Sequence, residues 1–367
     1  MRRAPQQVFE RRELGDAIGM GDIAPMIEGS GRNRCLNLFA WLLAGLTLFL
    51  ICSGGMVTSK GVGLAVPDWP TTFGYNMFLF PVSQWVGGIF FEHTHRILAS
   101  VIGVLTIILA VWLWRAESRK WLRVLGIVAL GAVILQGVLG GLRVTMLKDE
   151  IGIFHACLAQ AFFGLLVLIA VATSRAPSEA VPRTLHSRFL WLPIFTVSLI
   201  YLQLGLGATM RHQHRDLAIL DFPAAYAQVI PNLSAERLAA INETRAARAL
   251  SEVTPAQILL QLAHRFGALL ISIGVIASWF SLRGYARKLR QLSTVWVILL
   301  AAQITLGAWT IWSNKAADIA TAHVAVGAAM LAVGVSIWAL AYRMRAPELG
   351  DTGPSKRSPA PEEAHAF

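Results

Sequence analysis

The chain has 367 residues, of which 55% are hydrophobic and only 14% are charged, and its formal net charge is +11. Soluble globular domains carry about a quarter charged residues, so this composition excludes an ordinary soluble domain. The apolar residues recur in runs that approach the ~20 residues needed to cross a bilayer. The sequence therefore predicts an integral membrane protein that crosses the bilayer several times.

The chain begins with a polar and charged segment, residues 1–35, without the apolar stretch of a cleavable signal peptide. Apolar positions within residues 233–250 predict a short surface helix. Residues 344–367 are rich in Gly, Pro, Ser and charge, so we expect a disordered tail. Eight apolar runs are the predicted transmembrane helices: 36–58, 93–114, 121–144, 153–174, 189–210, 257–282, 292–313 and 319–342.

Basic residues distinguish the two sides of the predicted membrane. Of the 32 Lys and Arg residues, 21 fall on one side and nine on the other, and two lie at helix starts. Basic residues in short loops mark the cytoplasmic face, so we expect both termini to be cytoplasmic. The long loops 59–91 and 211–256 then face outside. Because topology accounts for the positive charge, we expect no binding to nucleic acid.

Histidines recur along the chain at a nearly constant offset. A His-Arg pair begins the second and the sixth spans, at His95 and His264, which are 169 residues apart. The fourth and eighth spans carry His155 and His323, which are 168 residues apart. An offset of this kind indicates an internal repeat. The predicted fold is an all-α membrane protein of eight transmembrane helices, built as two tandem, pseudo-symmetric four-helix bundles. The bundles are residues 36–175 and 189–343.

Each predicted bundle carries two of these histidines at one depth, because every even-numbered span enters from the outer face. Two facing imidazoles on neighbouring helices suit the axial positions of a heme iron. Copper would usually recruit Cys, Met or carboxylate ligands at short spacing, which this pattern lacks. For a single histidine, a hydrogen bond to a neighbouring helix is the alternative. His93 competes with His95 as a ligand, but only His95 precedes an arginine, as His264 does.

Two arginines follow the histidines directly. Arg96 and Arg265 could pair with heme propionates, because a guanidinium binds a carboxylate through two parallel hydrogen bonds. The alternative is that both side chains simply extend to the membrane boundary.

One carboxylate breaks the symmetry of the repeat. Glu92 stands three residues before His95, on the same helix face, where it could accept a proton beside a bound porphyrin. The matching position in the second bundle is Gln261. This difference indicates chemistry in the first bundle and electron transfer in the second. The structural alternative is an ion pair of Glu92 with Arg143 or Lys148.

Taken together, the Glu-x-x-His-Arg start of the second span, the second His-Arg pair and the two single histidines resemble the heme A synthase family. The resemblance covers about residues 36–342. It implies oxidation of the C8 methyl of heme O to the formyl group of heme A by successive hydroxylations, for cytochrome c oxidase assembly. Some family members carry a cysteine pair in the first outer loop, and this sequence has no cysteine within 59–91.

The resemblance also implies roles for individual residues. His95 and His155 would hold the substrate heme O, with Glu92 assisting catalysis. His264 and His323 would ligate a b-type heme cofactor through two imidazoles.

The family further implies a bacterial inner or plasma membrane location and contact with lipid. Its implied partners are a heme O synthase and an unidentified redox partner, and a homo-oligomer is a further possibility. A diheme b-type membrane cytochrome that exchanges electrons with quinone explains the histidines equally well, but leaves Glu92 without a role. A transporter of parallel repeats ranks last, because it predicts polar breaks at the bilayer midplane.

Overall fold

The structure is a computed structural model, and it describes residues 34–174, 188–213 and 217–344. Most of the predicted N-terminal segment and of the tail lies outside these residues. The described residues form helices joined by loops, without a β-strand. The eight long helices are α3 (Arg34–Ser59), α4 (Gly87–Ala116), α5 (Lys120–Met146), α6 (Asp149–Thr173), α7 (Arg188–His212), α9 (Pro255–Leu282), α10 (Arg287–Trp312) and α11 (Ala317–Arg343).

All eight predicted spans are confirmed as helices long and apolar enough to cross a membrane. The largest difference is at α4, which begins at Gly87, six residues before the predicted start. The predicted surface helix is confirmed as α8 (Ala235–Ala246), whose first turn is capped by the hydroxyl of Ser234. Two short 3-10 helices, η1 (Met77–Leu79) and η2 (Val82–Gln84), lie in the loop before α4.

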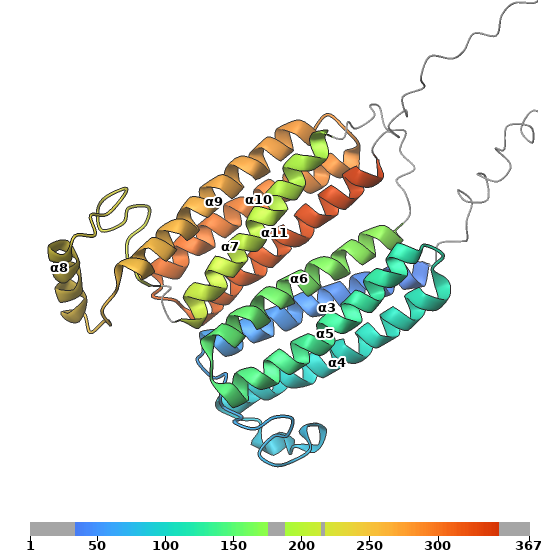
Figure 1. The fold of residues 1–367 in the computed structure, drawn as a ribbon, viewed down its shortest axis with the longest axis horizontal. Helices are drawn as coiled ribbons and strands as arrows, with labels where there is room; N and C mark the ends of the chain where they lie inside the picture. The colour runs from blue at the N-terminus through green and yellow to red at the C-terminus, as the bar shows by residue number, and fades with distance from the viewer. Residues whose placement is uncertain (1–33, 175–187, 214–216, 345–367) are drawn as a thin grey trace, which may run out of the picture.

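The long helices form two adjacent groups, which Figure 1 shows side by side: α3 to α6, and α7 with α9 to α11. The groups meet at α6 and α11. In each of these two helices 56% of the most apolar stretch is buried, compared with 17% in α5 and α10. Arg343 at the end of α11 donates hydrogen bonds to the carbonyls of Val171 (2.6 Å) and Ser174 (3.0 Å). At the opposite end, the hydroxyls of Ser59 and Thr321 lie 3.2 Å apart. Polar contacts therefore join the two groups at both ends.

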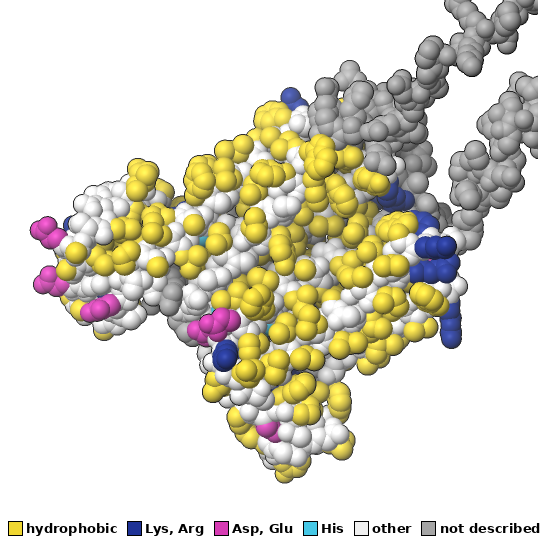
Figure 2. All heavy atoms as spheres, in the orientation of Figure 1, with side chains coloured by type: hydrophobic (Ala, Val, Ile, Leu, Met, Phe, Trp, Pro, Cys, Tyr) yellow, Lys and Arg dark blue, Asp and Glu magenta, His cyan; other side chains and the backbone are white. Residues whose placement is uncertain are grey.

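Each group has an apolar core, and its outward faces are apolar as well. Leu43 and Leu109 are fully buried in the first core, and Trp296 and Ile337 in the second. Hydrophobic side chains also cover the flanks of the helices in Figure 2. Exposed examples on these flanks are Val104, Ile107, Leu135, Ile273 and Ile298. So much exposed apolar surface is unfavourable in water and suits lipid, so the chain is an integral, multi-pass membrane protein.

Two carboxylates hold turns in the long loops that join α3 to α4 and α7 to α9. Asp68 accepts hydrogen bonds from the backbone amides five and six residues ahead, at 2.8 and 2.9 Å. Asp221 accepts the same two hydrogen bonds in the second loop, both at 2.8 Å. Such turns need backbone conformations that L-residues rarely adopt. Positive φ angles occur at all four donor residues: Phe73, Gly74, Tyr226 and Ala227.

The hydrogen bonds of this turn lower the pKa of the Asp68 carboxyl group. Burial raises the pKa, but hydrogen bonds from Gly74, Thr71 and Phe73 outweigh it and lower the pKa from 3.8 to about 2. Because the folded pKa lies below the unfolded one, the stabilisation is fully present above pH 3.8 and is lost as the pH falls through about 2. At neutral pH, Asp68→Ala should speed amide hydrogen exchange at Phe73 and Gly74 on the order of tenfold. Equal exchange in both proteins would contradict a role of the carboxylate in the turn.

Candidate functional site

The four predicted ligand histidines lie on four helices, near the end of the molecule that carries the long loops. His95 is on α4, His155 on α6, His264 on α9 and His323 on α11. The ring centres of His264 and His323 are 6.5 Å apart, and their ring planes are inclined at 56°. His95 and His155 interact electrostatically. The structure therefore brings the rings of His264 and His323 together and places His155 where its charge acts on His95.

Each of the four rings packs against a glycine on the preceding long helix. The distances that follow join Cε1 of each ring to the position that a Cβ atom would take on the glycine. The four contacts are Gly54–His95 at 2.9 Å, Gly140–His155 at 3.3 Å, Gly207–His264 at 3.5 Å and Gly307–His323 at 3.1 Å. A Cβ atom on Gly54 would force the ring of His95 to move, and Cβ atoms on Gly140 and Gly307 would be tight against their rings, whereas the distance at Gly207 is an ordinary contact.

The Nδ1 atom of each of the four histidine rings is buried. Among the described residues, no hydrogen bond of ordinary length reaches the four buried Nδ1 atoms. The backbone carbonyl of Gln136 nevertheless faces His155, and that of Gln303 faces His323. A backbone carbonyl at Nδ1 is the usual way to orient an imidazole that binds a metal through Nε2.

The His264–His323 pair fits a metal held between its two rings. A metal–imidazole bond is about 2 Å and the nitrogen is about 1 Å from the ring centre, so two rings on opposite sides of one metal have centres roughly 6 Å apart. The observed 6.5 Å agrees with that distance. Within the described ranges, no group of three or more His, Cys, Asp or Glu side chains could hold a metal ion. A donor set of two neutral imidazoles suits a metal whose other ligands come from a porphyrin.

His93, the competitor of His95, lies in a different environment. Its ring is fully buried under the first long loop, 4.6 Å from the ring of Trp85 and 5.2 Å from that of Phe80. Its Nδ1 atom is 3.2 Å from the hydroxyl of Thr72. This packing holds the loop on α4, whereas the ring of His95 faces α3 and the interior of the helix group.

Glu92 is buried and has two partners. One carboxylate oxygen accepts a hydrogen bond from the backbone amide of Val66 at 2.9 Å, and the other forms an ion pair with Arg96 at 2.7 Å. Arg96 also donates hydrogen bonds to the carbonyls of Val66, Asp68 and Thr71. The close partner of Glu92 is thus Arg96, while Arg143 acts on it only at longer range. The donors of Arg96 are directed to the loop.

Gln261 and Arg265 hold the second long loop in a similar way. Gln261 accepts a hydrogen bond from the amide of Ile219 at 2.7 Å and donates one to its carbonyl at 3.2 Å. Arg265 donates to the carbonyls of Asp221 (2.6 Å) and Ala224 (2.7 Å). The guanidinium groups of Arg96 and Arg265 therefore anchor loops, and their pairing with heme propionates stays a prediction.

Comparison with known proteins places this arrangement in a family. Residues 37–335, from α3 into α11 and including all four histidines, match the family model described as cytochrome oxidase assembly protein. The chain belongs to this family. The heme A synthase of Geobacillus kaustophilus is 24% identical to it over 334 residues, which cover 85% of this chain and 93% of that protein. The heme A synthase of Halalkalibacterium halodurans is 27% identical over 309 residues, or 79% of this chain and 92% of that protein.

The contact between Gly54 and His95 can be tested by filling the space that the glycine leaves. Gly54→Val would bring a side chain against the ring, so we expect His95 to be displaced and heme binding in the first helix group to fall roughly tenfold. Gly45→Val on the same helix is the matched control, because nothing lies within 4 Å of a Cβ atom at that position. Titration of both purified variants with heme measures the difference in heme binding between them. Equal binding would mean that the glycine does not set the position of the ring.

Proposed function

We propose that the chain is a heme A synthase, which oxidises the C8 methyl of heme O to the formyl group of heme A for cytochrome oxidase assembly. The observation that carries this proposal is the family match, which extends across both histidine pairs. The relatives named heme A synthase align over most of their own length, which supports the same activity in this chain. The enzyme is then an oxidoreductase that acts on a methyl group.

The two pairs of histidines receive separate roles in this proposal. His95 and His155 would hold the substrate heme O in the first helix group. His264 and His323 would hold a b-type heme through two imidazoles, a role supported by the fit of their ring separation to a single metal. When bound, this heme supplies a one-electron carrier near the substrate.

Glu92 would take up protons released from the substrate. Its carboxylate is the group that distinguishes the first helix group from the second, where Gln261 makes the corresponding loop contacts. An amide can also hold a loop, as Gln261 does, but it cannot accept a proton at neutral pH. In this proposal the carboxylate of Glu92 would therefore have a role besides its loop contact and its ion pair with Arg96.

The two groups would be tandem copies of one unit, residues 36–175 and 189–343. Corresponding contacts support the duplication, since a glycine meets each histidine and an aspartate holds each long loop. A heme O synthase would supply the substrate, and a separate redox partner would accept electrons. The farnesyl chain of heme O would reach the protein through the surrounding lipid.

Both termini would lie in the cytoplasm and the long loops outside. In Figure 2 the Lys and Arg side chains gather at the end where α4 meets α5, and the acidic side chains gather at the opposite end. The charge pattern supports this orientation. Reporter fusions at Ser118, between α4 and α5, and at Asn232, in the second long loop, should report opposite sides. Reporters on the same side would overturn the topology.

The activity can be tested with the purified protein. The protein is incubated with heme O and a cell fraction that supplies the redox partner, and the extracted pigments are separated by chromatography. We expect heme A among the products. The rival function, a diheme cytochrome, predicts reversible reduction by quinol and unchanged heme O. Recovery of heme O alone, from protein that retains its heme spectrum, would contradict the proposed function.

A further inference from the structure

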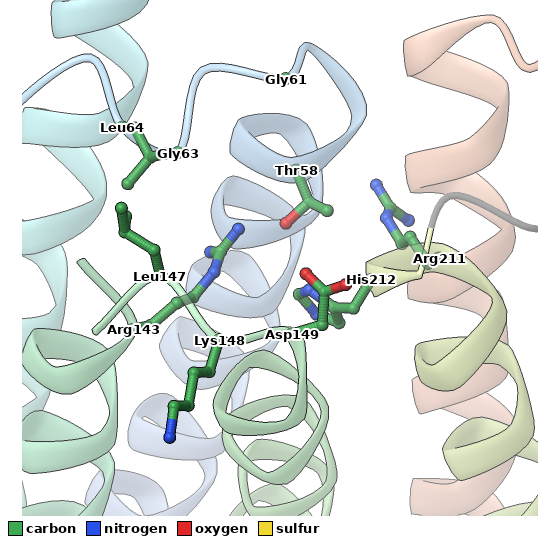
Figure 3. A pocket seen from close by; sticks show the side chains of 10 residues that line it. All are labelled: Thr58, Gly61, Gly63, Leu64, Arg143, Leu147, Lys148, Asp149, Arg211 and His212. Atoms are coloured by element: carbon green, nitrogen blue, oxygen red, sulfur yellow. The ribbon is translucent and has the colours of Figure 1, made fainter. Parts of the chain in front are cut away.

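A cleft opens at the loop end of the molecule, between the two helix groups (Figure 3). It is lined by the ends of α3, α5 and α7, the start of α6 and the beginning of the first long loop. Arg143, Lys148 and Arg211 contribute positive charges to its lining, and Asp149 contributes the single negative one. A cleft with excess positive charge attracts anions.

Arg143 differs from the other arginines near the histidines. Its side chain, from α5, reaches towards the first long loop, where a Cβ atom on Gly63 would be 2.9 Å from its Nη2 atom. Within the described part of the chain, its guanidinium forms no hydrogen bond or salt bridge. By contrast, Arg96 and Arg265 donate to several loop carbonyls. A partly buried guanidinium with five N–H donors and no close acceptor is well suited to receive an anionic ligand.

The position of Arg143 relates it to the first histidine pair. It follows Gly140, which packs on His155, by three residues, or about 4.5 Å along the helix towards the loop end. It acts electrostatically on both His95 and His155. The residue three positions after Gly307 in the second group is Thr310, an uncharged side chain. A cation at this position is therefore particular to the first group.

We infer that Arg143 binds a propionate carboxylate of the macrocycle held between His95 and His155. This inference rests on the proposed function of the first helix group. The cleft is lined by Thr58 and Arg143, which lie four and three residues nearer the loop end than Gly54 and Gly140, the glycines that contact His95 and His155. The propionate edge of a porphyrin held by these two histidines would reach the cleft if it pointed towards the loops. Pairing with a guanidinium offsets the desolvation of a carboxylate at the membrane boundary and fixes how the ring is turned. Arg143 is thus a positioning residue that presents one edge of the substrate to the enzyme.

The test compares a macrocycle with free propionates and one without them. Purified full-length protein is titrated with hemin and with hemin dimethyl ester, and absorbance reports binding. The His95→Ala protein is titrated in the same way, and its absorbance change gives the part of the signal that does not come from binding at the first histidine pair. The unaltered protein should bind hemin roughly tenfold to hundredfold more tightly than the diester, because a charge-assisted pair is lost with the ester.

Arg143→Gln should abolish this preference, and Arg143→Lys should keep part of it. Lys60→Gln is the control, because Lys60 is exposed at the same end of the molecule and lies over the ring of Phe91, outside the cleft lining. An intact spectrum of the heme in the second group reports correct folding of each variant. A retained preference in Arg143→Gln would overturn this inference alone. Absence of any His95-dependent binding would instead contradict the proposed function.

Discussion

Purified protein with His264→Ala or His323→Ala is expected to lose the b-type heme spectrum of the unaltered protein. Each ring would supply one of the two protein ligands of the heme, and the ring centres are 6.5 Å apart. Removal of either imidazole would take away one of these ligands and weaken the retention of the heme. We expect the ratio of heme to protein to fall roughly tenfold or more. Reduced-minus-oxidised difference spectra and pigment extraction measure the loss.

The first helix group provides the control for that experiment. His95→Ala removes the same kind of side chain from the matching position of α4, and it should leave the b-type spectrum in place. An unchanged spectrum in His264→Ala or His323→Ala would contradict the assignment of the cofactor. Loss of the spectrum in His95→Ala as well would mean that the two pairs do not form separate sites.

Glu92→Gln should preserve folding and the b-type heme but reduce heme A production at least tenfold. The amide can accept a hydrogen bond from the Val66 amide and donate one to its carbonyl, as Gln261 does with Ile219. The substitution removes the negative charge that can accept a proton, and general acid–base catalysis typically contributes about 10²–10⁴-fold. Heme extracts from cells that contain only this variant, at equal protein level, measure the effect.

Glu150→Gln is the matched control for Glu92→Gln. Glu150 is exposed in the first turn of α6, at the same end of the molecule. Because an exposed surface charge contributes little to stability, this variant should fold normally and produce nearly normal heme A. Nearly normal heme A from Glu92→Gln would show that Glu92 serves only to hold the loop through Arg96 and Val66.

The helices and the histidine pairs could be predicted from the sequence because both leave regular signals. A membrane span needs a long apolar run, so helix ends were predicted to within a few residues except at α4 and α10. The repeat favours His95 over His93 as a ligand, which stays a prediction, and the structure places the buried ring of His93 against Trp85 of the first long loop. Gly140 and Gly307 also belong to the repeat, because each follows a glutamine (Gln136 and Gln303) by four residues and the two glycines are 167 residues apart.

The contacts of the loops could not be predicted in this way. Arg96 and Arg265 stand beside the histidines in sequence, which suggested propionates, but their donors reach carbonyls of loops that fold back over the helix ends. Which loop atoms meet a helix depends on turns such as the one held by Asp68, and a single sequence gives no register for them. The ion pair of Glu92 with Arg96, rather than with Arg143, has the same origin.

Heme content of cells tests the central claim most directly. The protein is expressed in a host that makes heme O but lacks a heme A synthase of its own, and hemes B, O and A are separated from extracts with and without it. If the chain is a heme A synthase, heme A appears only with the protein and heme O falls. Unchanged heme O without any heme A, from membranes that contain the folded protein with its b-type spectrum, would contradict the claim.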